Sequence, residues 1–121
     1  MEVSELIKNV EFEVCSFETS FAKMSDGDFT YLDPPYAPKQ KTSFVNYTLK
    51  GFDKQQHLDL FKICGSLREK NIKMMMSNSA TELVTNNFST ELFTIDKIVC
   101  KRLINSSNPN DTAKEVIVRN Y

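Results

Sequence analysis

The sequence predicts a single α/β domain. Its 121 residues, of which 40% are hydrophobic, suffice for one core and are too few for two. Short apolar runs with the spacing of strands alternate with segments in which apolar residues recur at helical spacing. Strands separated by helices in this way are typical of a sheet that contains parallel strands.

The first two strands are predicted from apolar runs in the N-terminal third. Val10, Phe12 and Val14 alternate with two glutamates, which indicates a half-buried strand over 10–14. A polar segment follows, and the next apolar run predicts a second strand over 29–33. This second strand leads directly into a pair of prolines.

The clearest helix is predicted to begin at Asp53. Gln56 lies three residues further on, which is the spacing of a capping box. Apolar residues then recur at helical spacing to about residue 70, and His57 on this helix is expected at the surface. The other expected elements are a short helix over 4–9, a long polar loop over 37–52, a strand over 72–77, a short helix from 79 or 81 to 87, and two terminal strands over 92–100 and 113–120.

Composition excludes several classes of protein. Fifteen basic and sixteen acidic residues give a net charge of −1, so the chain lacks the basic excess of a self-sufficient nucleic-acid binder, although a local basic patch stays open. Three widely spaced cysteines without histidine pairs predict neither a disulfide framework nor a metal site, and they indicate a reduced, cytoplasmic setting. No run approaches the ~20 apolar residues of a membrane span.

The stretch Asp33-Pro34-Pro35-Tyr36 is the strongest candidate site. Each proline fixes its own φ and restricts the residue before it, so the turn is held in one extended shape. The prolines donate no N–H, which leaves the Asp33 carboxylate and the Pro34 carbonyl as neighbouring acceptors beside the Tyr36 ring. Two such acceptors suit the hydrogens of a planar exocyclic amine and favour a nitrogen lone pair directed out of the plane, where an electrophilic methyl could be attacked.

The Tyr36 ring suggests that the amine belongs to a base. Stacking of a base on an aromatic ring is worth ~1–3 kcal/mol, and a base inside a duplex would have to flip out to reach the turn. The same four residues could instead form an ordinary strand-ending turn, since Asp and Pro are common in turns.

The residues around the turn resemble a known family. "DPPYAP" is followed by "KTSFVNYT", a capped helix, "IKMMMSNSATE" and "VCKRLINSSN". Over nearly the whole chain this pattern resembles the C-terminal half of the Dam-like (D12 class) adenine-N6 DNA methyltransferases. The resemblance implies a partial class I methyltransferase (Rossmann-like) fold, with strands 4-5-7-6 contiguous and the terminal strand antiparallel. It also implies methyl transfer from S-adenosylmethionine to adenine N6 in double-stranded DNA.

The resemblance further implies roles for individual residues. Asp33 and Pro34, with Pro35, would bind the amino group, and Tyr36 would stack on the flipped adenine. The cofactor would be bound by Ser16, Phe17 and Asp33, although Phe17 could equally be a simple core aromatic. The DNA and the target base would be contacted by Tyr36, Lys41, Thr42, Ser43, Phe44, Asn46, Tyr47, Lys101 and Arg102. These polar residues could equally belong to an ordinary solvated surface.

The family's glycine-rich cofactor turn has no counterpart among the three scattered glycines of this chain. We therefore expect residues 1–121 to form one partial catalytic domain without that motif or a target-recognition domain, and to need a second polypeptide that supplies both. In such a domain, residues 10–14 would pair with 29–33, pair with another chain, or remain a poorly held edge.

Two other functions remain open from the sequence. The chain could be an inactive, truncated remnant or a weak nucleic-acid-binding module without catalysis. A remoter alternative is methylation of a different planar amino group, such as cytosine N4 or a glutamine amide.

Overall fold

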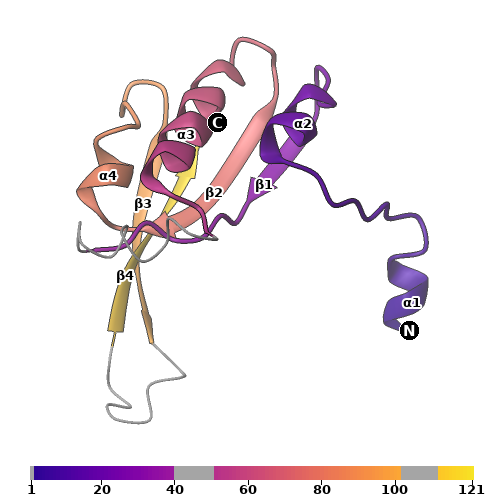
Figure 1. Ribbon diagram of the computed structural model, residues 1–121, viewed down its shortest axis with the longest axis horizontal. Coiled ribbons are helices and arrows are strands. Elements are labelled where there is room, and N and C mark those ends of the chain that lie inside the picture. Colours follow the sequence, from indigo (N-terminus) through magenta and orange to yellow (C-terminus); the bar gives the residue numbers. More distant parts are fainter. Residues whose placement is uncertain (1, 40–50, 102–111) are drawn as a thin grey trace.

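The computed structural model describes residues 2–39, 51–101 and 112–121, and its centre is a four-stranded mixed sheet (Figure 1). The strands are β1 (Phe29–Leu32), β2 (Lys73–Ser79), β3 (Thr94–Lys101) and β4 (Thr112–Arg119), in the order β1-β2-β4-β3. β1 and β2 are parallel, whereas β4 is antiparallel to both β2 and β3. The predicted contiguous pairing of these four segments, with the last strand antiparallel, is confirmed.

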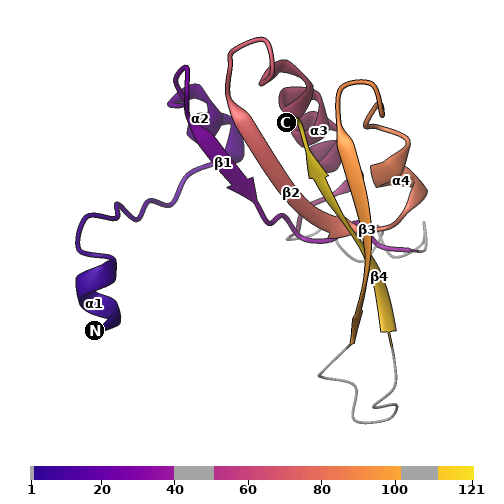
Figure 2. The same cartoon turned by 180° about the vertical axis from the view of Figure 1, so that it is seen from behind.

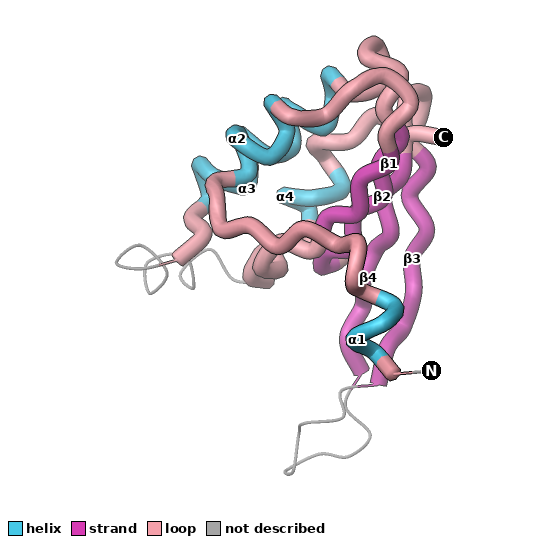
Figure 3. Tube along the Cα trace, turned by 90° about the vertical axis from the view of Figure 1, so that its right-hand side faces the viewer, coloured by secondary structure: helices cyan, strands magenta, loops and turns pink. Residues whose placement is uncertain are grey.

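The helices are α1 (Val3–Leu6), α2 (Phe17–Ala22), α3 (Lys54–Ser66) and α4 (Glu82–Thr85). α2, α3 and α4 all lie on one face of the sheet, as Figures 1 and 3 show, while α1 stands apart at the end of an extended arm. The core lies between these three helices and the sheet, and Met74, Met76, Val116 and Val118 supply its sheet side. Within the described ranges, no helix covers the opposite face (Figure 2).

α3 begins where its capping box predicts. The Asp53 carboxylate accepts a hydrogen bond from the Gln56 backbone N–H at 2.8 Å, and the Gln56 side chain accepts one from the Asp53 N–H at 2.9 Å. The helix ends at Ser66, earlier than expected, because the chain turns back at Asn71, which has a φ of 54°. The turn is closed by a bond from the Ile72 N–H to the Leu67 carbonyl.

The predicted surface position of His57 is wrong. The side chain is only 1% exposed, and its ring meets Phe52 edge-on with centroids 4.7 Å apart. Burial lowers its pKa. Helical spacing does indicate this burial, because His57 precedes Leu60, Phe61 and Cys64 by three, four and seven residues and so shares their buried face. Phe52 from the preceding loop completes the cover.

The predicted half-buried strand over 10–14 is also wrong. These residues have no regular secondary structure, and Phe12 and Val14 are 78% and 104% exposed. The expected pairing of residues 10–14 with residues 29–33 is not observed, because β1 pairs only with β2 among the described residues. The segment is instead a loosely attached, exposed arm. The alternation of apolar residues is that of a strand, but no described strand pairs with this segment.

The short helix α2 was not anticipated. Ser16 caps it by accepting a hydrogen bond from the Thr19 N–H at 3.2 Å. The signal lay in the serine itself, which is a favoured N-cap residue. Phe21 on this helix is buried against the core.

We expect alkaline pH to destabilise the fold through Cys64. Burial in the core raises the pKa of this thiol from the ordinary 9.0 to about 12. The folded chain therefore holds the proton more tightly than the unfolded chain, so this stabilisation is complete below pH 9 and is lost as pH rises toward 12. One such group changes the free energy of unfolding by at most about 1.4 kcal/mol per pH unit.

The measurement is urea unfolding of the protein and of Cys64→Ala at a series of alkaline pH values. Other groups titrate equally in both proteins, so the stability advantage of the parent chain should shrink as pH rises. An advantage that stays constant with pH would contradict the predicted linkage.

Candidate catalytic turn and its surroundings

The Asp33-Pro34-Pro35-Tyr36 turn directly follows the carboxyl end of β1. Leu32 pairs with Met76 in the parallel ladder, so Asp33 and Ser77 are the next residues on the two neighbouring strands. The carboxyl ends of parallel strands share one edge of a sheet, and open α/β sheets bind ligands there. Asp33, Pro35 and Tyr36 are exposed at this edge.

Two hydroxyl groups on the sheet orient the Asp33 carboxylate. The Tyr31 hydroxyl donates to Ser77 Oγ at 3.1 Å, and Ser77 Oγ donates to Asp33 Oδ1 at 3.0 Å. A carboxylate can accept about four hydrogen bonds. Ser77 therefore fixes one oxygen in position and leaves the group with acceptor capacity for a ligand.

The far side of the turn is anchored by the next two residues of β2. Asn78 Oδ1 accepts from the Ala37 N–H at 3.0 Å, and Ser79 Oγ donates to the Ala37 carbonyl at 2.6 Å. Asn78, Ser79 and Ala37 are all buried. Buried hydrogen bonds of this kind are expensive to break, so both ends of the four-residue turn are tied to β2.

Tyr36 is held through its hydroxyl group. It donates to Glu115 Oε2 on β4 at 3.1 Å, while 37% of the side chain remains exposed. Burial, followed by the nearby Glu115 and Asp33 carboxylates, raises the pKa of the Tyr36 phenol. The phenol therefore stays a proton donor to Glu115 at neutral pH, and one anchored edge leaves the ring available for stacking.

The predicted cofactor residues lie at the start of α2. Ser16 is the N-cap, and its Oγ is engaged with Thr19. Phe17 is half-buried, packs against the core and meets Phe52 edge-on at 5.7 Å. A short connection joins α2 to β1, so the start of the helix lies toward the end of the strand that leads to Asp33 (Figure 1). Asp33 is predicted to belong both to the residues that bind the amino group and to those that bind the cofactor.

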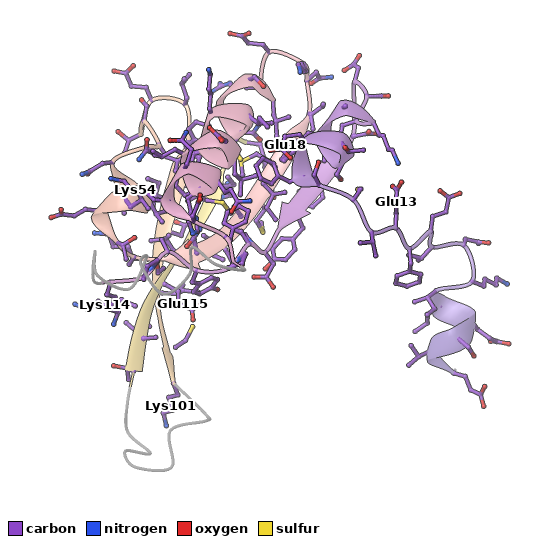
Figure 4. All side chains as sticks on the ribbon, in the orientation of Figure 1. Glu13, Glu18, Lys54, Lys101, Lys114 and Glu115 are labelled. Carbon is purple, nitrogen blue, oxygen red and sulfur yellow. The ribbon has the colours of Figure 1, made fainter. Side chains whose placement is uncertain are left out.

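Most of the predicted DNA-contacting residues cannot be placed. Lys41, Thr42, Ser43, Phe44, Asn46, Tyr47 and Arg102 lie outside the described residues. Lys101 is exposed at the end of β3, where the β3–β4 hairpin extends beyond the rest of the sheet (Figure 4). Figure 4 shows it well apart from Glu115, the partner of Tyr36.

Sequence reasoning missed the residues that hold the turn. The sequence pattern predicts a strand over 72–77 but no contact of the turn with Ser77, Asn78, Ser79, Tyr31 or Glu115. The available signal was a run of three small polar residues following an apolar strand at the ligand-binding edge of the sheet. The hydrogen-bond partners of these residues depend on strand register, which a single sequence does not specify.

Three comparisons with known proteins place the chain among methyltransferases. The family model for D12 class N6 adenine-specific DNA methyltransferases matches residues 1–103. A Type II methyltransferase of Lactococcus lactis subsp. cremoris, M1.LlaDCHI, is 35% identical over 98% of this chain and 43% of its own length. The Methanocaldococcus jannaschii Type II methyltransferase M.MjaIII is also 35% identical, over 98% of this chain and 42% of its own length.

The DNA adenine methylase of Escherichia coli is 35% identical over 66% of this chain and 29% of its own length. A solved Entamoeba histolytica methyltransferase superposes with a TM-score of 0.52 at 15% identity, covering 98% of this chain and 40% of that one. This likeness shows the fold. The chain spans less than half the length of each of these proteins. In the part of the chain that the structure describes, no helix is long and apolar enough to cross a membrane.

Proposed function

The chain belongs to the family of D12 class N6 adenine-specific DNA methyltransferases, and we propose that it is the C-terminal catalytic segment of such an enzyme. It would transfer a methyl group from S-adenosylmethionine to N6 of an adenine flipped out of double-stranded DNA. The observation that carries the proposal is the turn from Asp33 to Tyr36, which is tied to β2 at both ends while Asp33 and Tyr36 remain exposed.

The proposed chemistry follows from the two acceptors of the turn. The Asp33 carboxylate and the Pro34 carbonyl would accept the two N–H groups of the adenine amine, which turns the nitrogen lone pair out of the ring plane. Ser77 holds the carboxylate in position before the base arrives, so little reorganisation is needed. Tyr36 would stack on the base, and stacking combined with two directed hydrogen bonds fixes which atom is presented.

The residues present fit one side of S-adenosylmethionine. Phe17 offers a half-buried ring at the start of α2, and Asp33 offers an exposed carboxylate. When bound, the cofactor would supply an electrophilic methyl group. Ser16 fits less well, because its hydroxyl already caps α2. We propose that Phe17 and Asp33 form one wall of the site, and that residues outside this chain form the other.

The four-stranded sheet is consistent with our proposal of an incomplete class I, Rossmann-like domain. In the family's strand numbering, β1, β2, β4 and β3 would be strands 4, 5, 7 and 6. Sheets with parallel strands are usually covered on both faces, yet Phe29, Tyr31 and Tyr121 lie on or beside the uncovered face with 55%, 56% and 46% exposure. β1 also has a free edge, with which no described strand pairs.

We propose that a second polypeptide carries the glycine-rich turn and the target-recognition domain. It would cover the uncovered face and pair with the free edge of β1 and the arm. The chain spans less than half the length of these relatives. The exposed apolar side chains of residues 10–14 alternate as a strand requires, so the arm could add to the partner's sheet.

We expect this chain alone to bind S-adenosylmethionine very weakly, because one wall of a site buries only part of a ligand. Isothermal titration calorimetry should detect binding only after a polypeptide with the glycine-rich half of a family member is added. Phe17→Ala should weaken that binding, whereas Leu92→Ala, which shortens an exposed apolar side chain that has no part in the proposed cofactor site or partner contact, should not alter it.

The same mixture should methylate duplex DNA. Micromolar affinity of the isolated chain would show that the cofactor wall has been misplaced. A mixture that assembles but never methylates DNA would favour an inactive remnant over the proposed enzyme.

A further inference from the structure

A cavity of about 690 Å³ opens beside the catalytic turn and is not used by the chemistry above. Its walls come from four segments: the chain just after the turn, the start of α3, the segment from β2 into α4, and β4. The Ala80 N–H bonds the Lys114 carbonyl at 3.1 Å, which joins two of these walls. The cavity therefore belongs to the same sheet edge as Asp33 and Tyr36.

The cavity walls are more positively charged than the chain as a whole. Among the described residues, Lys39, Lys54 and Lys114 line the cavity against one carboxylate, that of Glu82, so the described lining has three positive charges, one negative charge and an excess of two. The whole chain carries −1. Figure 4 shows Lys54 on α3 and Lys114 on β4 toward the same side of the molecule. The remaining polar lining is neutral and includes Thr81, Asn86 and Asn87.

Lys54 is the first residue of α3. The Asp53 carboxylate already caps this helix end, so the attraction for an anion here comes from the lysine and not from the helix dipole. Lysine binds phosphate as a flexible point charge, and three lysines from separate segments suit a row of phosphates better than one small anion.

We propose that this cavity is a backbone-phosphate site for DNA, gripping the strand beside the nucleotide that enters the turn. Lys39 follows Tyr36 by three residues, and Ala37 between them is pinned to β2. A strand held by the lysines therefore lies next to the stacking ring. The proposal rests on the proposed function, because it takes the ligand of the turn to be a DNA base.

The test is the salt dependence of duplex DNA binding by the full chain, measured by fluorescence anisotropy from about 50 to 200 mM salt. Each lysine that neutralises a phosphate contributes about 0.9 to the slope of log affinity against log salt. We expect Lys39→Ala, Lys54→Ala and Lys114→Ala each to lower the slope by about that amount, and the triple variant to lower it by about three times as much.

A matched control removes the same charge elsewhere. Lys62, Lys70 and Lys73 are exposed and do not line the cavity, so their triple alanine variant has the same net charge as the cavity variant. Its slope should stay close to that of the parent chain. An NMR titration with inorganic phosphate separates a general anion site from a DNA site.

The outcomes are distinct. Equal slopes for the cavity and control variants would overturn the phosphate site, while methyl transfer by the assembled enzyme would still support the proposed function. Tight binding of inorganic phosphate, with DNA binding unaffected by the lysines, would assign the cavity to a small anion and overturn the DNA site. Absence of DNA binding by the parent chain would also overturn the phosphate site. Failure of the assembled enzyme to methylate DNA is a separate result, which bears on the proposed function.

Discussion

Asp33→Ala is expected to lower the methylation rate of the assembled enzyme by about 10²- to 10³-fold, the usual cost of removing one preorganised hydrogen-bonding group that acts on the reacting centre. The variant loses one of the two acceptors for the adenine amine. Its effect should appear in kcat, because the ring of Tyr36 still binds the base. Single-turnover methyl transfer to a duplex oligonucleotide measures this step directly.

Folding should be little affected by the same change. Asp33 is exposed, and its carboxylate has one hydrogen bond, to Ser77, among the contacts that the structure describes. Substitutions of this kind usually change the free energy of unfolding by less than about 1 kcal/mol. Near-normal turnover of Asp33→Ala would sink the proposed chemistry.

Ser77→Ala provides a graded comparison. It keeps the carboxylate but removes the hydroxyl that orients it, so it should slow methylation less than Asp33→Ala does. If the serine variant were as slow as the alanine variant at Asp33, the hydroxyl would have a chemical role beyond positioning.

The elements that sequence predicts well here are those specified locally. The α3 start depends on Asp53 and Gln56, three residues apart, and both bonds of the capping box are present. The turn from Asp33 to Tyr36 was located because its prolines restrict their own neighbours. In such cases the residues that decide the structure lie within one turn of chain.

What sequence reasoning missed depends on residues far apart. Ser77 meets Asp33 across 44 residues, and Glu115 meets Tyr36 across 79. These pairs are set by strand register, which a single sequence does not specify. The arm shows the converse: its alternation correctly indicates a segment suited to pairing, but a strand forms only where a partner offers backbone hydrogen bonds. Among the described residues, no strand pairs with the arm.

Tyr36→Ala is expected to lower kcat/KM by about 5- to 150-fold, the range that corresponds to ~1–3 kcal/mol for stacking of one base. Tyr36→Phe keeps the ring and loses only the hydroxyl bond to Glu115. A partly exposed neutral-to-charged bond of this kind helps to orient the ring and should matter far less, by a factor of about 2 to 5. Steady-state kinetics on a duplex containing the target adenine separates the two variants.

Glu115→Gln tests whether the hydroxyl acts only through this anchor. Its amide oxygen can still accept from Tyr36, so the variant should be as mild as Tyr36→Phe, and the double variant should be no worse than either one alone, because both remove parts of one interaction. A severe defect in Tyr36→Phe beside a normal Glu115→Gln would mean that the hydroxyl touches the substrate. The ring would then be more than a stacking surface, and the base would have to lie closer to β4 than to Asp33.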